Sequence, residues 1–303
     1  MKKLSLKKFV KLLNKKFPYL VVKTNQYFRD YTTFKIGGKM GAFAQISDKA
    51  TLLLVLRLIK KYNIPYFILG NGSNLLVGDK KINKFVIKVC LKDIAIRKNQ
   101  IICGAGVNLF ALNVFAMNNC LTNLEWSYGI PGSVGGAIKN NAGCFGKDMS
   151  QVVSCVYYTD GYKIYRRTKK QLDFSYRHSY FSDKNFVILR VVFDMKKGEK
   201  GQIFNTMQQI YQKRKDTQPY NYSSAGSVFK RIDNTPIPPL IEKCNLKGLI
   251  RGGAQISIKH CGFVINYTGK AKFRDVFWLF CKIKKTIYKK FGIILEQEIE
   301  IVK

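Results

Sequence analysis

Apolar and polar positions alternate with helical spacing in several parts of the chain. Residues 3–17 place apolar side chains at three- and four-residue intervals among lysines, which predicts a short amphipathic helix. Packing against the rest of the protein is the favoured role of this helix, and docking on a membrane is the alternative. The same spacing predicts further helices at about 49–62, 108–119, 202–215 and 273–290.

Short apolar runs between turn signals predict β-strands. Single strands are expected at 65–69, 84–90 and 293–302, and two strands around a glycine turn at 32–38 and 41–47. Paired runs predict hairpins at 94–107, 154–167 and 254–267. In the second hairpin, Asp160-Gly161 is typical of a tight type I′ turn. Helices and strands mixed in this way predict an α+β fold.

A charged, glycine-containing stretch, "KKGEKG" at 196–201, is the best candidate for a domain boundary. The expected organisation is a basic N-terminal helix at 1–24, a larger domain at 25–200 and a second domain at 201–303. No apolar run approaches the roughly 20 residues that span a bilayer. The N-terminal residues also lack the uninterrupted apolar core of a secretion signal. A cytoplasmic protein without membrane contact is therefore expected.

Composition narrows the possible functions. Eight cysteines include no CxxC pair and only two histidines are present, so no metal site is expected. The net charge of +35 would favour nucleic-acid binding, but the lysines occur in every segment and form no single stripe. An excess of residues with AT-rich codons explains the charge better, and no nucleic-acid partner is expected. The positive field should still speed the arrival of polyanionic ligands.

Two glycine-rich loops are the strongest candidates for a binding site. "LGNGSNLLV" at 69–77 follows a predicted strand, and "GIPGSVGGA" at 129–137 is followed by "NNAG" at 140–143. Positions without side chains let backbone N–H groups approach a phosphate or a flat ligand. A tight turn without a ligand would have the same sequence. Together, the loops favour a dinucleotide clamped between two small lobes, without the GxGxxG of a Rossmann fold.

Seven separated motifs resemble one family of flavoproteins. They are "TTFKIGG", "LGNGSNLLV", "GAGV", "GIPGSVGGAIKNNAG", "SYRHS", "SSAGSVFKR" and "LEQEI", in that order. Their order and spacing resemble UDP-N-acetylenolpyruvoylglucosamine reductase of peptidoglycan synthesis over about residues 25–302. The chain lacks the tyrosine-bearing insertion of the longer subclass, so it resembles the shorter one.

The resemblance implies a two-lobed FAD-binding unit of the vanillyl-alcohol-oxidase type at 25–200 and a C-terminal substrate domain at 201–303. Its ligands would be FAD, NADPH and UDP-N-acetylglucosamine enolpyruvate. The protein is expected to be a monomer. FAD should be held without a covalent bond, because the glycine loops contain no histidine. The residues implied to bind FAD are Gly70, Asn71, Gly72, Ser73, Asn74, Gly129, Ile130, Pro131, Gly132 and Ser133.

Three catalytic residues are implied by the same resemblance. Arg177 in "SYRHS" matches the arginine that holds the substrate carboxylate and stabilises an enolate, and Ser227 matches the proton donor. Glu298 in "LEQEI" matches their carboxylate partner. Arg214 and Gln218 are weaker candidates for binding the sugar diphosphate. Without the family, Arg177 would be read as a surface arginine, Ser227 as a turn residue and Glu298 as an exposed strand position.

Two other functions remain open. A flavin oxidase for alcohols or lactones could share the fold, but many such enzymes tether FAD through a histidine, and the first histidine here is His178. A basic nucleic-acid-binding protein would leave the glycine loops unexplained.

The loop after Ser227 departs from the family, because Ile232 follows Arg231 where the family continues with proline. The match to the family motif at the serine loop therefore ends at Arg231.

Overall fold

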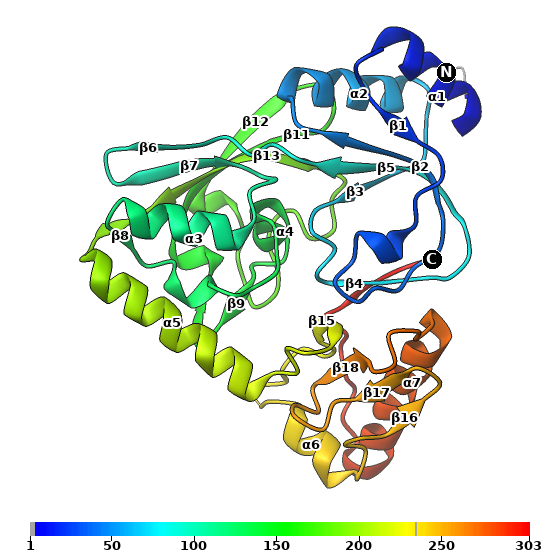
Figure 1. Ribbon diagram of the computed structural model, residues 1–303, viewed down its shortest axis with the longest axis vertical. Helices are drawn as coiled ribbons and strands as arrows, with labels where there is room; N and C mark the ends of the chain where they lie inside the picture. Colours follow the sequence, from blue (N-terminus) through cyan, green and yellow to red (C-terminus); the bar gives the residue numbers. More distant parts are fainter. Residues whose placement is uncertain (1–3, 234) are drawn as a thin grey trace. The chain divides into compact units, whose positions relative to one another are not determined.

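Helices and strands alternate through the part of the chain that the computed structural model describes, residues 4–233 and 235–303 (Figure 1). The helices are α1 Leu6–Lys16, α2 Lys49–Lys61, α3 Leu109–Asn118, α4 Val134–Lys139, α5 Lys200–Thr217, α6 Pro238–Lys243 and α7 Phe273–Phe291. Short 3₁₀ helices cover Phe28–Asp30, Glu125–Ser127, Met149–Gln151 and Lys169–Gln171. The five helices expected from spacing are confirmed within a few residues, and residue 3 lies outside the described residues.

The contacts divide the chain into two units that are not continuous in sequence. Unit 1 contains the described residues up to Thr24, with Gly41–Asn71 and Asn83–Gln212. Unit 2 contains Asn25–Met40, Gly72–Ile82 and Lys213–Lys303. The expected boundary at 200/201 falls at the start of α5, whereas the units divide inside this helix. The expected domains also placed 25–40 and 72–82 with the larger N-terminal part.

Unit 1 contains two sheets. The first has the order β1 (Val22–Lys23), β2 (Met40–Ile46), β5 (Ile82–Val89), β3 (Tyr66–Leu69). The second has the order β12 (Ile164–Thr168), β11 (Val153–Thr159), β13 (Val187–Asp194), β7 (Gln100–Gly104), β6 (Ile94–Arg97), and all its neighbouring strands run antiparallel. Two small pairs, β8 (Leu121–Thr122) with β14 (Lys196–Lys197) and β9 (Gly143–Cys144) with β10 (Lys147–Asp148), complete the unit.

One continuous apolar core joins the two sheets of unit 1. Phe9 of α1 packs edge-on against Phe85 of β5, with ring centroids 5.5 Å apart. Figure 1 shows α1 and α2 over the first sheet, and α3 and α4 beside the second. Leu112 of α3 and Val191 of β13 belong to the same buried cluster. The N-terminal helix therefore packs into unit 1, as the favoured interpretation of its apolar face expected.

Unit 2 is a smaller α+β layer with its own core. Its sheet has the order β15 (Ser223–Ser227), β18 (Phe263–Asn266), β17 (Ala254–Ile256), β16 (Ile250–Arg251), and β4 (Leu75–Val77) pairs in parallel with β19 (Glu300–Val302). Ile256 of β17 and its cross-strand partner Val264 of β18 share the core with Leu279 of α7. Phe34 and Ile36 are buried in this core as well.

The strand expected at 32–38 is wrong. These residues form turns and irregular backbone, although Phe34 and Ile36 are both buried. Lys35 between them has a φ of 57°, in the left-handed region that interrupts a strand. The alternation of apolar residues therefore reflects insertion into the core of unit 2 and not a pleated strand. The following strand, β2, is confirmed.

Two finer expectations also fail. β11 and β12 pair as far as Thr159 and Ile164, so the turn spans residues 160–163 and is longer than the expected two-residue turn. The Asp160 carboxylate accepts hydrogen bonds from the N–H groups of Tyr162 and Lys163, at 2.8 and 2.9 Å, which closes this longer loop. The last strand is confined to Glu300–Val302, and most of the expected run before it is irregular. None of the helices within the described residues combines the length and apolar character needed to cross a membrane.

Asn266→Ala should destabilise the protein. Asn266 is 3% exposed; its Nδ2 donates to the carbonyl oxygen of Phe34 at 3.2 Å and its Oδ1 accepts from the N–H of Ala271 at 3.0 Å. Leaving these buried partners unpaired should lower the free energy of unfolding by about 1–3 kcal/mol. Urea unfolding measures the change. Asn205→Ala, on the exposed side of α5, should stay within about 0.5 kcal/mol of the unchanged protein, and an equal loss in both variants would contradict the prediction.

Candidate active site

The two glycine loops contact each other inside unit 1. Asn71 donates a hydrogen bond from Nδ2 to the carbonyl oxygen of Pro131 at 3.2 Å. Gly70 lies against Ser133, because a Cβ built on Gly70 would come within 2.4 Å of the Ser133 hydroxyl oxygen. The loops are about 60 residues apart in sequence, and these contacts place them side by side.

Ser133 explains why residue 70 has no side chain. The Ser133 hydroxyl caps α4 by accepting a hydrogen bond from the N–H of Gly136 at 3.4 Å. A methyl group on Gly70 would displace this hydroxyl and the loop that carries it. The loop pair thus presents mainly backbone at this point, which fits close approach of a flat or phosphate-bearing ligand.

The remaining residues of the first loop belong to unit 2. Gly72 is buried with a φ of 63°, and a Cβ there would meet the Tyr31 carbonyl oxygen at 2.3 Å. Ser73 is half-buried. Asn74 donates from Nδ2 to the carbonyl oxygen of Glu298 at 3.0 Å, and its own carbonyl accepts from the N–H of Glu300 at 3.0 Å. Asn74 is one of the residues that the resemblance implies for FAD binding, and its side chain holds the segment that carries Glu298.

Ser227 and Glu298 lie on neighbouring backbone segments of unit 2. Ser227 ends β15, pairs with Phe263 of β18 and is half-buried. The residue after it, Val228, accepts a hydrogen bond through its carbonyl oxygen from the Glu298 N–H at 2.9 Å. Lys230 extends this pairing by an ion pair with Glu296 at 2.5 Å. The structure thus brings two of the three predicted catalytic residues together.

Thr33 is a residue of this site that sequence reasoning missed. Its hydroxyl donates to the carbonyl oxygen of Ser224 at 2.7 Å, and its N–H donates to the carbonyl oxygen of Gly72 at 3.2 Å. One residue thereby joins the serine loop to the glycine loop. Thr33 does lie in one of the motifs that resemble the family, "TTFKIGG", which could have indicated a role at the site. The alternation of apolar residues in that motif favoured a strand instead.

Arg177 belongs to unit 1, on a tight turn. Ser175 and His178 pair across this turn, and Arg177 itself has a φ of 55°. Its Nη2 donates to the carbonyl oxygen of Gly143 at 3.0 Å. The side chain is half-buried. Arg177 is therefore held by the "NNAG" end of the second glycine motif and is not a loose surface arginine.

The two weaker candidates lie at the end of α5 in unit 2. Arg214 is 4% exposed, which is unusual for a charged side chain. Its carbonyl oxygen accepts a hydrogen bond from the N–H of Gln218 at 2.9 Å. Gln218 is half-buried. Arg214 is therefore not a solvent-exposed side chain on the surface of α5.

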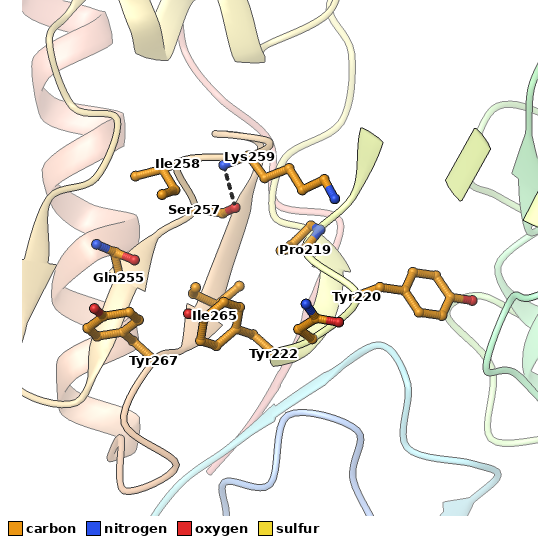
Figure 2. Close-up of a pocket in the computed structure, with 10 residues that line it drawn as sticks. Pro219, Tyr220, Tyr222, Gln255, Ser257, Ile258, Lys259, Ile265 and Tyr267 are labelled. Carbon is orange, nitrogen blue, oxygen red and sulfur yellow. Dashed lines mark hydrogen bonds between the residues drawn. The ribbon is translucent and has the colours of Figure 1, made fainter. Parts of the chain in front are cut away.

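A cavity of about 250 Å³ lies in unit 2 beside the start of β15. It is lined by Pro219, Tyr220, Asn221, Tyr222, Gln255, Ser257, Ile258, Lys259, Ile265 and Tyr267. Figure 2 shows the rings of Tyr222 and Tyr267 at one end, with centroids 5.7 Å apart, and Ser257 and Lys259 at the other. The Ser257 hydroxyl accepts from the N–H groups of Lys259 and His260, both at 3.2 Å. Burial lowers the pKa of the neighbouring His260 imidazole, and the Lys259 ammonium group donates to the carbonyl oxygen of Lys215 at 2.5 Å.

The predicted site residues form two groups, each held within its own unit. Unit 1 contains Gly70, Asn71, Gly129, Ile130, Pro131, Gly132, Ser133 and Arg177. Unit 2 contains Gly72, Ser73, Asn74, Arg214, Gln218, Ser227 and Glu298. Among the described residues there is no cluster of three or more histidine, cysteine, aspartate or glutamate side chains arranged to hold a metal ion.

Known families match both parts of the chain. Residues 41–160 match the model of an FAD binding domain, and residues 218–302 match that of the UDP-N-acetylenolpyruvoylglucosamine reductase C-terminal domain. The glycine loops fit the cofactor of the first family, because Asn71 and Pro131 hold two glycine-rich backbone segments side by side, and such backbone can approach a phosphate closely. The expected α+β fold, with a two-lobed FAD-binding unit followed by a C-terminal domain, is confirmed by these matches.

Whole-chain relatives agree with the two domain matches. A UDP-N-acetylenolpyruvoylglucosamine reductase from Clostridium novyi is 39% identical over 296 residues, which cover 96% of each chain. The enzyme of the same name from Caldanaerobacter subterraneus is 39% identical over 280 residues and 92% of each chain. The crystal structure of the Thermus caldophilus enzyme superposes with a TM-score of 0.79 at 31% identity, covering 94% of this chain and all of that one. The chain belongs to the UDP-N-acetylenolpyruvoylglucosamine reductase family.

Proposed function

We propose that the chain reduces the enolpyruvyl group of UDP-N-acetylglucosamine enolpyruvate to give UDP-N-acetylmuramate, a step of peptidoglycan precursor synthesis. Similarity to reductases of this name over 96% of the chain is the observation that carries the proposal. NADPH is the proposed electron donor, and a monomer is the proposed active form. Family membership does not favour the alternative of an alcohol or lactone oxidase.

Backbone of the two glycine loops is proposed to hold FAD without a covalent bond. In unit 1 the cofactor residues would be Gly70, Asn71 and Gly129 to Ser133, and in unit 2 they would be Gly72 and Ser73, with Asn74 contributing through its backbone. When bound, FAD would supply the hydride that it has accepted from NADPH to one carbon of the enolpyruvyl double bond. The chain must then provide a proton and stabilise negative charge.

Arg177, Ser227 and Glu298 are proposed to perform that acid and electrostatic chemistry. The Arg177 guanidinium would hold the substrate carboxylate and stabilise the enolate that develops beside it. The Ser227 hydroxyl would donate a proton to the second carbon, a task that needs no general base. The contact of the Glu298 backbone with Val228 supports a role for this carboxylate near Ser227, in orienting the substrate.

The cavity of unit 2 is proposed to receive the nucleotide end of the substrate. The rings of Tyr222 and Tyr267 offer flat apolar faces to a pyrimidine, and the Lys259 side chain offers positive charge to the diphosphate. The cavity begins at Pro219, directly after Gln218. Arg214 and Gln218 therefore remain proposals for the same end of the substrate.

Anaerobic mixing tests the proposed activity. NADPH should bleach the visible absorption of the bound flavin, and the enolpyruvyl sugar nucleotide should then restore it without oxygen. An oxidase would instead be reduced by an alcohol or lactone and restored by oxygen. A protein that NADPH bleaches but that only oxygen restores would contradict the proposed substrate.

Gly70→Ala should weaken FAD binding. The new Cβ would lie 2.4 Å from the Ser133 hydroxyl, which must move and lose its cap on α4. A capping interaction of about 1 kcal/mol together with loop displacement corresponds to roughly tenfold weaker binding. Fluorescence titration of the flavin-free protein measures this. Gly201→Ala on α5, whose nearest new contact would be Glu199 at 3.5 Å, is the matched control and should bind FAD normally.

Ser227→Ala should slow only one of the two half-reactions. Flavin reduction by NADPH requires no proton from Ser227 and should keep a near-normal rate. Reoxidation by the enolpyruvyl substrate should be about 10²–10⁴-fold slower, the usual effect of losing a positioned proton donor. Stopped-flow absorbance separates the two steps.

Two further variants sharpen this test. Ser227→Cys keeps a weak donor and should retain more activity than Ser227→Ala, whereas Ser223→Ala at the start of the same strand should leave both steps intact. If Ser227→Ala slowed both half-reactions alike, the residue would shape the flavin pocket. If it slowed neither, the proposed role of Ser227 would be wrong.

A further inference from the structure

Asn141 is a buried amide at the end of the second glycine motif. It is 1% exposed and its backbone has a φ of 41°, a conformation that asparagine tolerates better than most residues. Its Nδ2 donates to the carbonyl oxygen of Ser175 at 2.9 Å and also approaches the Asp148 carboxylate at 3.3 Å. Its Oδ1 accepts from the N–H of Ser150 at 3.0 Å. The side chain thus joins three segments of unit 1.

One of these segments is the turn that carries Arg177. Asn141 binds the turn two residues before the arginine, at the Ser175 carbonyl. On the other side, the Ser179 hydroxyl donates to the carbonyl oxygen of Lys139 at 2.8 Å. Arg177 itself bonds to the carbonyl oxygen of Gly143. The turn is therefore fixed before, at and after Arg177 by one short segment, residues 139–143, through the Asn141 side chain and the carbonyl oxygens of Gly143 and Lys139.

Anchoring of this kind matters because the turn is strained and the arginine is flexible. Arg177 occupies the left-handed region, which a non-glycine residue leaves easily when its surroundings permit. An arginine side chain also has many rotamers, so its affinity for a carboxylate depends on how well its backbone is fixed. Without the Asn141 amide, the Ser175 carbonyl loses this donor and keeps the His178 N–H, so the turn gains freedom to rearrange.

We infer that Asn141 is a positioning residue for Arg177, and that recognition of the substrate carboxylate depends on this buried amide. The inference rests on the proposed function, because it takes Arg177 as the residue that binds the carboxylate. The competing explanation is that Asn141 only stabilises the loop at Asp148 and Ser150. Binding that depends on the carboxylate separates the two explanations, since a general loss of structure would weaken every nucleotide ligand.

Asn141→Gly is the variant of choice, because glycine accepts the positive φ and removes all the side-chain hydrogen bonds. Its affinity for two nucleotide sugars is measured by calorimetry on the oxidised holoenzyme. UDP-N-acetylmuramate has the lactyl carboxylate, whereas UDP-N-acetylglucosamine lacks it. We expect binding of the first to weaken about tenfold, the scale of one charge-assisted hydrogen bond, and binding of the second to stay unchanged. Asn205→Ala, on the exposed side of α5, is the control and should change neither affinity.

A double-mutant cycle tests whether Asn141 acts through Arg177. In an Arg177→Ala background, Asn141→Gly should cause no further loss of UDP-N-acetylmuramate affinity, because the group it positions is gone. Full additivity of the two losses would overturn the inference, and so would equal weakening of both nucleotide sugars.

The outcomes also separate this inference from the proposed function. If the wild-type protein failed to bind UDP-N-acetylmuramate, this result would refute the proposed function itself. Normal binding by the unchanged protein and by Asn141→Gly would refute only the positioning role. If Asn141→Gly does not fold, Asn141→Asp is interpreted in the same way, because it keeps an acceptor for Ser150 but cannot donate to Ser175.

Discussion

Irregular backbone that is partly buried needs hydrogen-bond partners, and the candidate site is built from such backbone. Three side chains supply these partners: Thr33 bonds to the Ser224 carbonyl, Asn74 to the Glu298 carbonyl and Asn141 to the Ser175 carbonyl. Each bond lies within three residues of a proposed catalytic residue or on that residue. The backbone segments that carry the proposed catalytic residues are therefore held by amide and hydroxyl donors that need no contact with substrate.

This dependence changes how the motif residues are interpreted. A polar residue in a glycine-rich loop is easily assigned to a ligand, as Asn74 was, yet its amide is engaged by the backbone of Glu298. Asn71 likewise uses its amide to join the two loops at Pro131. Glycine provides close approach to a ligand, and the neighbouring asparagines keep the glycine backbone in place. A substitution at either kind of residue should disturb the cofactor, but for different physical reasons.

Local sequence patterns predicted the helices and most strands correctly. They failed where contacts between residues distant in sequence determine the backbone conformation. Helices such as α2 and α7 have apolar residues at helical spacing within their own sequence, so this spacing was enough to locate them. The run at 32–38 has strand-like alternation, but Phe34 and Ile36 are buried in the core of a unit built mainly from residues after 212. No local signal shows that 25–40 and 72–82 belong there. Arg177, Ser227 and Glu298 came from motif order within a family, since none has a local chemical signature.

The charge of +35 bears on ligand capture more than on the fold. Ion pairs such as Arg190–Asp93, at 2.7 Å, involve half-exposed side chains and contribute about 0–1 kcal/mol each. The two apolar cores must therefore supply most of the stability, against mutual repulsion of the excess lysines. Both proposed substrates are polyanions, which a positive surface attracts over about 10 Å at 0.1 M salt. Such a field cannot distinguish one nucleotide from another. Selection among the attracted anions must come from short-range contacts, and Arg177, fixed on its turn, is the residue that we propose selects for a carboxylate.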